Sequence, residues 1–139
     1  MKNANMTVAT VILGLAMTIG AAAQDRKLDY QVLSTSRTST MEKELNQAAA
    51  SGYCFLKVSN SPNIFGGKEL VVVTVRDSGS AAPQAREYRV LSARGTSSLE
   101  KKLKEASKEG YEYLDQTTMP NIFGGSDNVI ILERSQPKE

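Results

Sequence analysis

The chain of 139 residues contains no histidine, no tryptophan and only one cysteine. Histidine is the commonest general base near neutral pH and a common metal ligand, so its absence removes the usual nucleophile–base pairs and zinc sites. A lone cysteine cannot form a disulfide within the chain, so the fold must rest on packing. We therefore predict no catalytic residues, no metal site and no cofactor.

A clear excess of positive charge is also missing. Lys2 is the only charged residue before Asp25, so residues 24–139 hold 16 basic and 15 acidic side chains. A protein that binds nucleic acid normally carries a marked basic excess, because it must neutralise phosphates. The composition therefore predicts no nucleic-acid partner.

The N-terminus differs from the rest of the chain. Lys2 is followed by a mostly apolar stretch over residues 8–19, which ends in the small residues Ala21, Ala22 and Ala23. This pattern is typical of a secretory signal peptide, and we predict cleavage after Ala23. The apolar run is shorter than the roughly 20 residues that span a bilayer, so no stable membrane span is expected after cleavage. An uncleaved membrane anchor is the alternative. We expect an exported chain, either periplasmic or extracellular.

An internal repeat dominates the remainder. Shifting the sequence by 58 residues aligns positions 28–77 with 86–135 without a gap and gives 21 identities. Average residue usage would give about three. The longest identical segment is Pro-Asn-Ile-Phe-Gly-Gly, at residues 62–67 and 120–125. The chain is therefore a tandem duplication, divided into a signal peptide (1–23), a first repeat (24–77), a linker (78–85), a second repeat (86–135) and a tail (136–139).

Each copy has the pattern of a β-α-β-β unit. An alternating strand around Tyr30 or Tyr88 precedes a helix with apolar residues at helical spacing, and Gly52 or Gly110 suits a left-handed helix end. Ser39 and Ser97, each three residues before a glutamate, predict N-terminal capping boxes. The third strand, residues 70–75 or 129–132, is almost entirely apolar and is expected to be buried on both faces.

One copy of about 50 residues would be marginal alone, so the two are expected to share a core. We predict an α+β fold of two β-α-β-β repeats related by a pseudo-two-fold axis. One or two antiparallel sheets would carry both helices on one side. Which strands meet across the copies cannot be derived from the pattern.

The repeat resembles a family of small bacterial domains known as domain of unknown function 4177. The resemblance rests on an aromatic-x-valine strand, a leucine-rich helix, a glycine followed by an aromatic, and an apolar strand that ends in arginine. In the second copy the matching residues are Tyr88, Val90, Leu99, Glu100, Leu103, Gly110, Tyr111, Leu114 and Arg134. The resemblance implies a fold but no activity, and the Pro-Asn-Ile-Phe-Gly-Gly segment is not part of that family's pattern.

That segment is the main candidate for a binding site. It joins the second and third strands of each copy, where a turn requires only polar residues, yet it contains isoleucine and phenylalanine in both. Either the apolar pair packs into the shared core, or the two loops present anchors to a partner. The candidate residues are Asn63, Ile64, Phe65, Gly66, Gly67, Asn121, Ile122, Phe123, Gly124 and Gly125.

Three further features have mainly structural interpretations. Cys54 fits a core position, with an intermolecular disulfide as the alternative. Lys101 and its neighbours alternate with glutamates and predict a solvated helix face. Arg76 and Arg134 end their strands and are expected to be edge or salt-bridge residues rather than to hold a ligand.

Taken together, these features predict an exported, non-catalytic binding module with a protein or peptide partner. A structural protein that self-assembles, as a homodimer or through its apolar third strands, is one alternative. An inhibitor of an extracytoplasmic enzyme is another. An enzyme ranks last.

Overall fold

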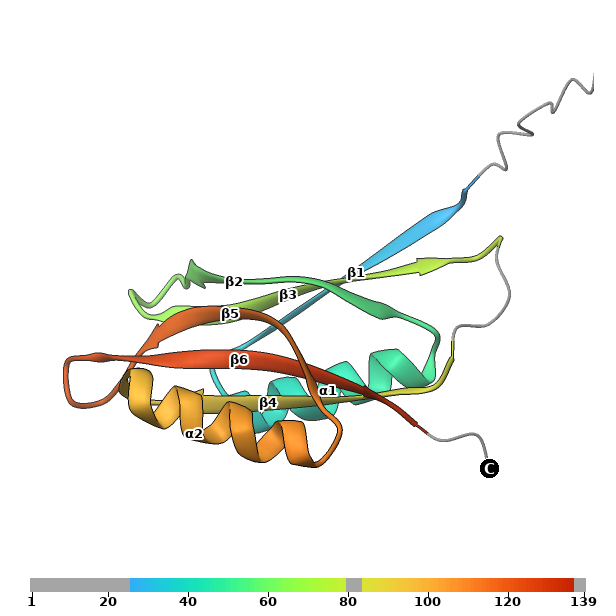
Figure 1. Cartoon of the computed structure of the whole chain (residues 1–139). Helices are drawn as coiled ribbons and strands as arrows, with labels where there is room; N and C mark the ends of the chain where they lie inside the picture. The colour runs from blue at the N-terminus through green and yellow to red at the C-terminus, as the bar shows by residue number, and fades with distance from the viewer. Residues whose placement is uncertain (1–25, 80–83, 137–139) are drawn as a thin grey trace, which may run out of the picture.

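A computed structural model describes residues 26–79 and 84–136 of the chain (Figure 1). The predicted signal peptide, residues 1–23, and the middle of the linker lie outside the described residues. The elements follow the order β1 (Leu28–Thr35), α1 (Thr38–Ala50), β2 (Cys54–Pro62), β3 (Lys68–Asp77), β4 (Arg86–Ala93), α2 (Gly95–Lys108), β5 (Glu112–Pro120) and β6 (Ser126–Ser135). The predicted α+β class and the repeated β-α-β-β order are confirmed.

Each copy forms its own antiparallel sheet of three strands. The orders are β1-β3-β2 and β4-β6-β5, so the apolar third strand of each copy lies in the centre. The register shifts at the same place in both copies, between Phe55 and Lys57 on β2 and between Tyr113 and Asp115 on β5. The duplication therefore kept not only the strand order but also the local irregularity of the second strand.

The helices end as predicted but do not begin as predicted. Gly52 and Gly110 have φ values of 88° and 87°, which only glycine adopts without strain. The amide of Tyr53 bonds the carbonyl of Ala48 at 3.0 Å, which completes a Schellman-type end. The predicted capping boxes are wrong: α1 begins at Thr38 and α2 at Gly95, so Ser39 and Ser97 lie inside the first turn, and neither helix has a side-chain cap.

The two copies stack in an asymmetric way. Helix α1 packs on β1 of its own copy and lies along the outer edge of β4, while β2 and β5 contact each other directly. Met41 and Leu45 on α1 are fully buried and belong to one core cluster with Tyr88, Val90 and Leu33. Helix α2 packs on the opposite face of the second sheet, against a smaller cluster that contains Ala93 and Ile130. The first sheet therefore packs on a layer that α1 and the second sheet form together, and α2 covers the other face of the second sheet.

This stacking differs from the predicted two-fold arrangement with both helices on one side. A two-fold axis would place equivalent residues in equivalent surroundings. Tyr88 and Val90 are 1% and 5% exposed, whereas Tyr30 and Val32, their equivalents, are 57% and 63% exposed. The second copy uses this face of its sheet to cover the first copy, whereas no residue within 26–79 or 84–136 covers the equivalent face of the first copy. The relation between the copies is head-to-tail.

The same asymmetry corrects the prediction for the third strands. In β6 the residues Val129, Ile130, Ile131 and Leu132 are all buried, as predicted. In β3 only alternate residues are buried, because one face of the first sheet is open to solvent. An apolar strand therefore indicates two covered faces only where a second layer is present.

Two polar contacts fix the junction between the copies. The side chain of Asn46 on α1 accepts a hydrogen bond from the amide of Tyr88 at 2.8 Å and donates one to its carbonyl at 2.9 Å. These contacts pair backbone groups at the outer edge of β4. The hydroxyl of Tyr88 reaches across and accepts a hydrogen bond from the amide of Phe55 at 3.0 Å. Burial raises the pKa of Tyr88 to about 12, so it remains neutral.

Replacing Asn46 with alanine should destabilise the chain. The change leaves both backbone groups of Tyr88 without their side-chain partner at a partly buried site, which typically costs about 1–3 kcal/mol per unsatisfied group. Lys104 holds the equivalent position on α2 and is exposed, so Lys104→Ala should change stability by no more than about 0.5 kcal/mol. Urea unfolding of both variants measures the difference. Equal effects of the two substitutions would contradict the junction described above.

Candidate functional site

The Pro-Asn-Ile-Phe-Gly-Gly segments form two β-hairpin turns of the same geometry. In the first, the amide of Asn63 bonds the carbonyl of Gly67 at 2.8 Å, and the amide of Gly66 bonds the carbonyl of Asn63 at 3.2 Å. Gly66 has a φ of +82°, which favours glycine. In the second turn the corresponding distances are 2.8 Å and 3.3 Å, and the φ of Gly124 is also +82°.

The turn geometry accounts for the asparagine and the two glycines. The side-chain oxygen of Asn63 accepts hydrogen bonds from the amides of Phe65 and Gly67 at 3.0 Å and 2.9 Å, which organises the turn from inside. A β-carbon at Gly67 would lie 3.1 Å from the side-chain nitrogen of Asn63, so the second glycine leaves room for that side chain. Asn121 makes the same pair of bonds in the second copy, both at 3.0 Å.

Isoleucine and phenylalanine are not explained by the turn. The two positions they occupy accept most residue types. Ile64 and Phe65 are 92% and 89% exposed, and Ile122 and Phe123 are 93% and 76% exposed. Of the two alternatives drawn from the sequence, packing into the shared core is therefore not observed. Both turns present a pair of large apolar side chains to solvent.

The two turns lie at the same end of the molecule, at the left of Figure 1. They are held there because β2 and β5, which lead into them, run side by side. The side chain of Asn60 on β2 donates to the hydroxyl of Thr117 at 3.1 Å and to the carbonyl of Thr118 at 2.8 Å. The amide of Val58 donates to the carboxylate of Asp115 at 3.2 Å. We call Ile64, Phe65, Ile122 and Phe123 the paired tips.

The second turn is tied to its surroundings more firmly than the first. Arg94 lies over the ring of Phe123, 5.0 Å from its centroid, and its Nε is 3.4 Å from Asp127. The side-chain nitrogen of Asn121 donates to the carboxylate of Asp127 at 2.9 Å. The hydrogen bond from Asn121, and to a lesser extent the contact with Arg94, holds the pKa of Asp127 below its ordinary value. The first copy has Ser36 in place of Arg94, so Phe65 lacks this cation–π contact.

A groove of about 330 Å³ lies between the beginning of α1 and the second hairpin. Its lining includes Arg37 and Thr38 on one side and Met119 and Pro120 on the other. Pro120 leads directly into the second tip. A partner that contacts the tips therefore meets a hollow beside them rather than a flat surface.

A second repeated cluster was not predicted as a unit from the sequence. In each copy a tyrosine that follows the helix donates its hydroxyl to a carboxylate on the first strand, and an arginine from the third strand pairs with that carboxylate. Tyr53 donates to Asp29 at 2.6 Å, and Arg76 lies 2.8 Å from the same oxygen. Tyr111 donates to Glu87 at 2.8 Å, and Arg134 is 2.8 Å from Glu87.

The cluster secures the end of the helix. The guanidinium of Arg76 also bonds the carbonyl of Ser51, and that of Arg134 bonds the carbonyl of Glu109, at 3.2 Å and 3.1 Å. Each arginine stacks on its tyrosine, with its Cζ atom 4.6 Å and 4.7 Å from the ring centroid. The predicted salt bridges of both arginines are therefore confirmed. The signal that the sequence offered was the acidic pair Asp29 and Glu87 at the repeat spacing, which an identity count overlooks.

The electrostatics of the cluster reinforce its resting charges. Hydrogen bonds from Arg134 and then from Tyr111 hold the pKa of Glu87 below its ordinary value. Burial, together with the bond to Glu87, raises the pKa of Tyr111. Arg89 also lies over the Tyr111 ring, 4.1 Å from its centroid, and pairs with Glu109 at 2.7 Å, which lowers the pKa of Glu109. A carboxylate with a lowered pKa and a tyrosine with a raised pKa are poor proton carriers near neutral pH.

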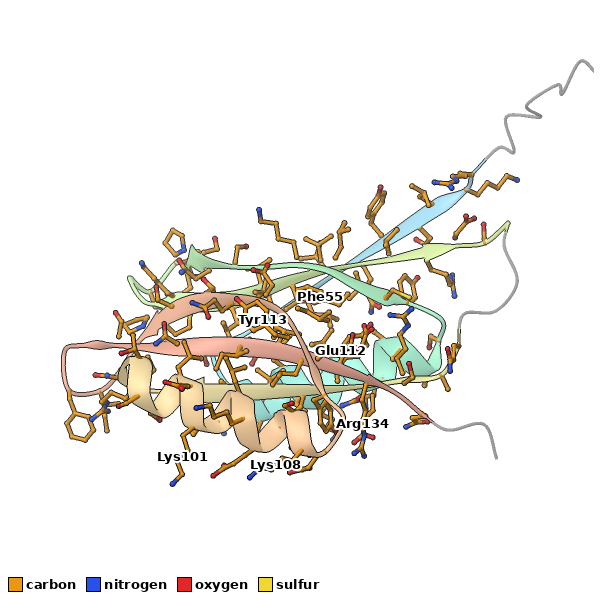
Figure 2. All side chains as sticks on the ribbon, viewed as in Figure 1. Phe55, Lys101, Lys108, Glu112, Tyr113 and Arg134 are labelled. Atoms are coloured by element: carbon orange, nitrogen blue, oxygen red, sulfur yellow. The ribbon has the colours of Figure 1, made fainter. Side chains whose placement is uncertain are left out.

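Other candidates contribute less. Cys54 is a free, half-buried cysteine. Figure 2 shows Lys101 and Lys108 projecting from α2 away from the sheets, as expected for a solvated helix face. Over residues 26–79 and 84–136, no three histidine, cysteine or acidic side chains gather as a metal site would require. Over the same residues, no helix is long and apolar enough to cross a membrane.

No family model, curated protein or solved structure matches this chain. The function must therefore be argued from the paired tips and their surroundings.

Replacing Glu87 with glutamine should lower stability in a pH-dependent manner. The pKa of Glu87 is lowered in the folded chain from an ordinary value of 4.5, so its ion pair stabilises the fold above that pH, and the contribution is lost as the pH falls through the folded value. The difference between the parent and Glu87→Gln should therefore be full at pH 7 and should shrink below about pH 4. Urea unfolding at both pH values measures it. Asp29→Asn is the matched variant, and its effect should be smaller because Asp29 is more exposed.

A difference for Glu87→Gln that is as large at pH 3 as at pH 7 would contradict this account, because it would show that the charge of Glu87 is not what stabilises the cluster.

Proposed function

We propose that this chain is an exported, non-catalytic binding module that engages a protein partner through its paired tips. The observation that carries the proposal is the exposure of Ile64, Phe65, Ile122 and Phe123 on two turns whose geometry does not require them. The asparagine and the two glycines of each segment serve the turn. The apolar pairs are what the turns present.

The energetics favour a bound state for these side chains. Full burial of an isoleucine or phenylalanine contributes roughly 1.5–3 kcal/mol. Four such side chains at one end of the molecule form the kind of anchor cluster that dominates protein interfaces. The tips stand on short hydrogen-bonded hairpins, and the strands that lead into them are joined through Asn60. Binding should therefore require little additional ordering of the backbone.

A protein partner fits these features better than other ligand classes. The chain after Ala23 is nearly neutral, which disfavours a phosphate backbone or a strongly anionic lipid surface. The two turns are separate anchors with a groove beside them, so they suit a surface with two apolar pockets. An inhibitor whose tips enter an enzyme's cleft is a specific form of this proposal.

The proposal that the module is not catalytic rests on its titratable groups. The acidic and tyrosine side chains that gather in the cluster around Glu87 are paired with one another and are shifted away from neutral pH. A catalytic acid or base is normally shifted toward it. The cluster also holds a helix end, which accounts for its recurrence in both copies.

The proposed export predicts a new N-terminus. Expression in a bacterial host should yield an extracytoplasmic chain that begins at Gln24, because signal peptidase cuts after small residues such as those at 21–23. Intact-mass analysis of the periplasmic and culture fractions measures this. Changing Ala21 and Ala23 to lysine should block processing. Recovery of the chain only in the cytoplasm, or of an unprocessed chain fixed in the membrane, would contradict the proposal.

Removing the tips should abolish binding without loss of stability. A photoreactive phenylalanine analogue at position 65 or 123 should crosslink to the same partner in extracts of the source organism, whereas the analogue at exposed position 101 on α2 should not. Excess unlabelled chain should compete, and a Phe65→Ser, Phe123→Ser variant should fail to compete. The variant's stability should stay within about 0.5 kcal/mol, because both rings are exposed.

Two outcomes would contradict this proposal. One is crosslinking of equal strength from position 101, which would indicate non-specific contact. The other is association of the chain with lipid vesicles that is lost in the Phe65→Ser, Phe123→Ser variant, which would identify the tips as membrane anchors instead.

A further inference from the structure

The first sheet has an apolar face that the described residues of the chain leave uncovered. Leu28, Tyr30 and Val32 on β1 are 44%, 57% and 63% exposed. Their partners in the antiparallel register include Val75 and Val73 on β3, which are half-buried, and Val71 follows on the same face. A face of an antiparallel sheet that meets water normally carries polar side chains. We call these residues the open face: Leu28, Tyr30, Val32, Val71, Val73 and Val75.

The same face of the second sheet is an interface. Tyr88, Val90, Val129 and Ile131 occupy the equivalent positions and are at most 5% exposed, because they pack on α1 and the first sheet. The open face is therefore the association surface of the repeat unit, present twice in the chain and used once within it. It is also the more apolar of the two: Leu28 and Val75 stand where the second copy has the ion pair Arg86–Glu133.

In the internal junction, this face of the second copy packs on a receiving surface of the first copy. The equivalent receiving surface of the second copy, at the other end of the molecule, is polar. In the first copy it includes Asn46, which bonds Tyr88, and the buried Val58. The equivalent residues of the second copy are Lys104 and Gln116, and both are exposed. A head-to-tail chain of molecules would have to cover the charge of Lys104 and bury Gln116, so the polar end terminates the stack, as capping units do in repeat proteins.

We propose that the open face binds the open face of a second copy of this chain, which forms a closed, isologous homodimer. In a second molecule, the equivalent face of the second copy is already buried and the free receiving surface is polar. Its open face is therefore the apolar surface available for pairing. Pairing like with like buries both apolar faces as two packed sheets and leaves no further interface. Lys57 and Ser59 line the β2 side of the face, so the charged and polar residues lie at its margin.

The size of the face sets the expected strength. Three strands of about eight residues cover roughly 400 Å² in projection at ordinary strand spacing. This lies below the area of about 800 Å² per partner in standard stable interfaces. The expected behaviour is therefore a reversible equilibrium between one and two chains that responds to concentration, rather than a permanent dimer.

Sedimentation velocity of residues 24–139, which include the whole described fold, tests the proposal over about 5–500 µM in reducing buffer, so that Cys54 cannot link two chains. The parent chain should shift from one to two chains across this range. Val32→Lys should remain a single chain at the highest concentration, with unchanged circular dichroism and melting, because Val32 is exposed within one molecule. Tyr30→Ser is the second variant and should weaken association at least tenfold.

Tyr113→Lys is the matched control. Tyr113 is 48% exposed and lies on the face of the second sheet that α2 partly covers, beside Glu112 on β5 (Figure 2). It should leave association unchanged. A parent chain that stays single at 500 µM would overturn the proposal, as would a Val32→Lys variant that still dimerises. Loss of association in Tyr113→Lys but not in Val32→Lys would show head-to-tail stacking and would overturn it as well. The Phe65→Ser, Phe123→Ser variant should dimerise normally, which separates this test from that of the paired tips.

Discussion

The structure depends on the burial of one helix from both sides. Met41 and Leu45 on α1 are completely buried because β1 and β3 lie on one side of the helix and β4 lies on the other. A single copy could cover only one side of such a helix and would leave its core thin. The second copy supplies the missing layer with Tyr88 and Val90, and Asn46 pairs the edge of β4 at the same point. The two copies thus share one core cluster.

This constraint explains where the two copies have diverged. Residues that form the strand order and the helix end recur in both copies, among them Gly52 and Gly110 and the two third-strand arginines. Two positions of the receiving surface differ: Asn46 and Val58 lie in the internal junction, whereas their equivalents Lys104 and Gln116 face solvent. Duplication made the positions equivalent in sequence, and stacking made them different in environment. The differences between the copies therefore carry as much structural information as the identities.

Much of the local structure could be predicted from the sequence, because it depends on neighbours in the chain. Alternating strands, helical spacing and a glycine at the helix end are signals of that kind. The capping boxes were predicted wrongly because serine three residues before glutamate also fits the first turn of a helix that starts earlier. The head-to-tail stacking was not predicted, because the 21 identities suggested symmetry. The burial of Tyr88 and exposure of Tyr30 depend on long-range packing that identical residues cannot reveal.

The sequence located the paired tips but could not distinguish core packing from exposure, since isoleucine and phenylalanine suit both. The structure makes that distinction through the turn: the side-chain oxygens of Asn63 and Asn121 accept hydrogen bonds from the amides of Phe65 and Phe123, and the turns held in this way leave the apolar side chains exposed. The tips and the open face then lie on different parts of the molecule, and neither proposed contact uses residues of the other. A dimer formed through the open face would present two sets of paired tips, on four turns in all. Two modest anchor sites held in one assembly bind a surface with repeated pockets far more tightly than either does alone, provided that the spacing fits. A small module with a weak self-association surface can in this way make its affinity for a partner depend on its own concentration.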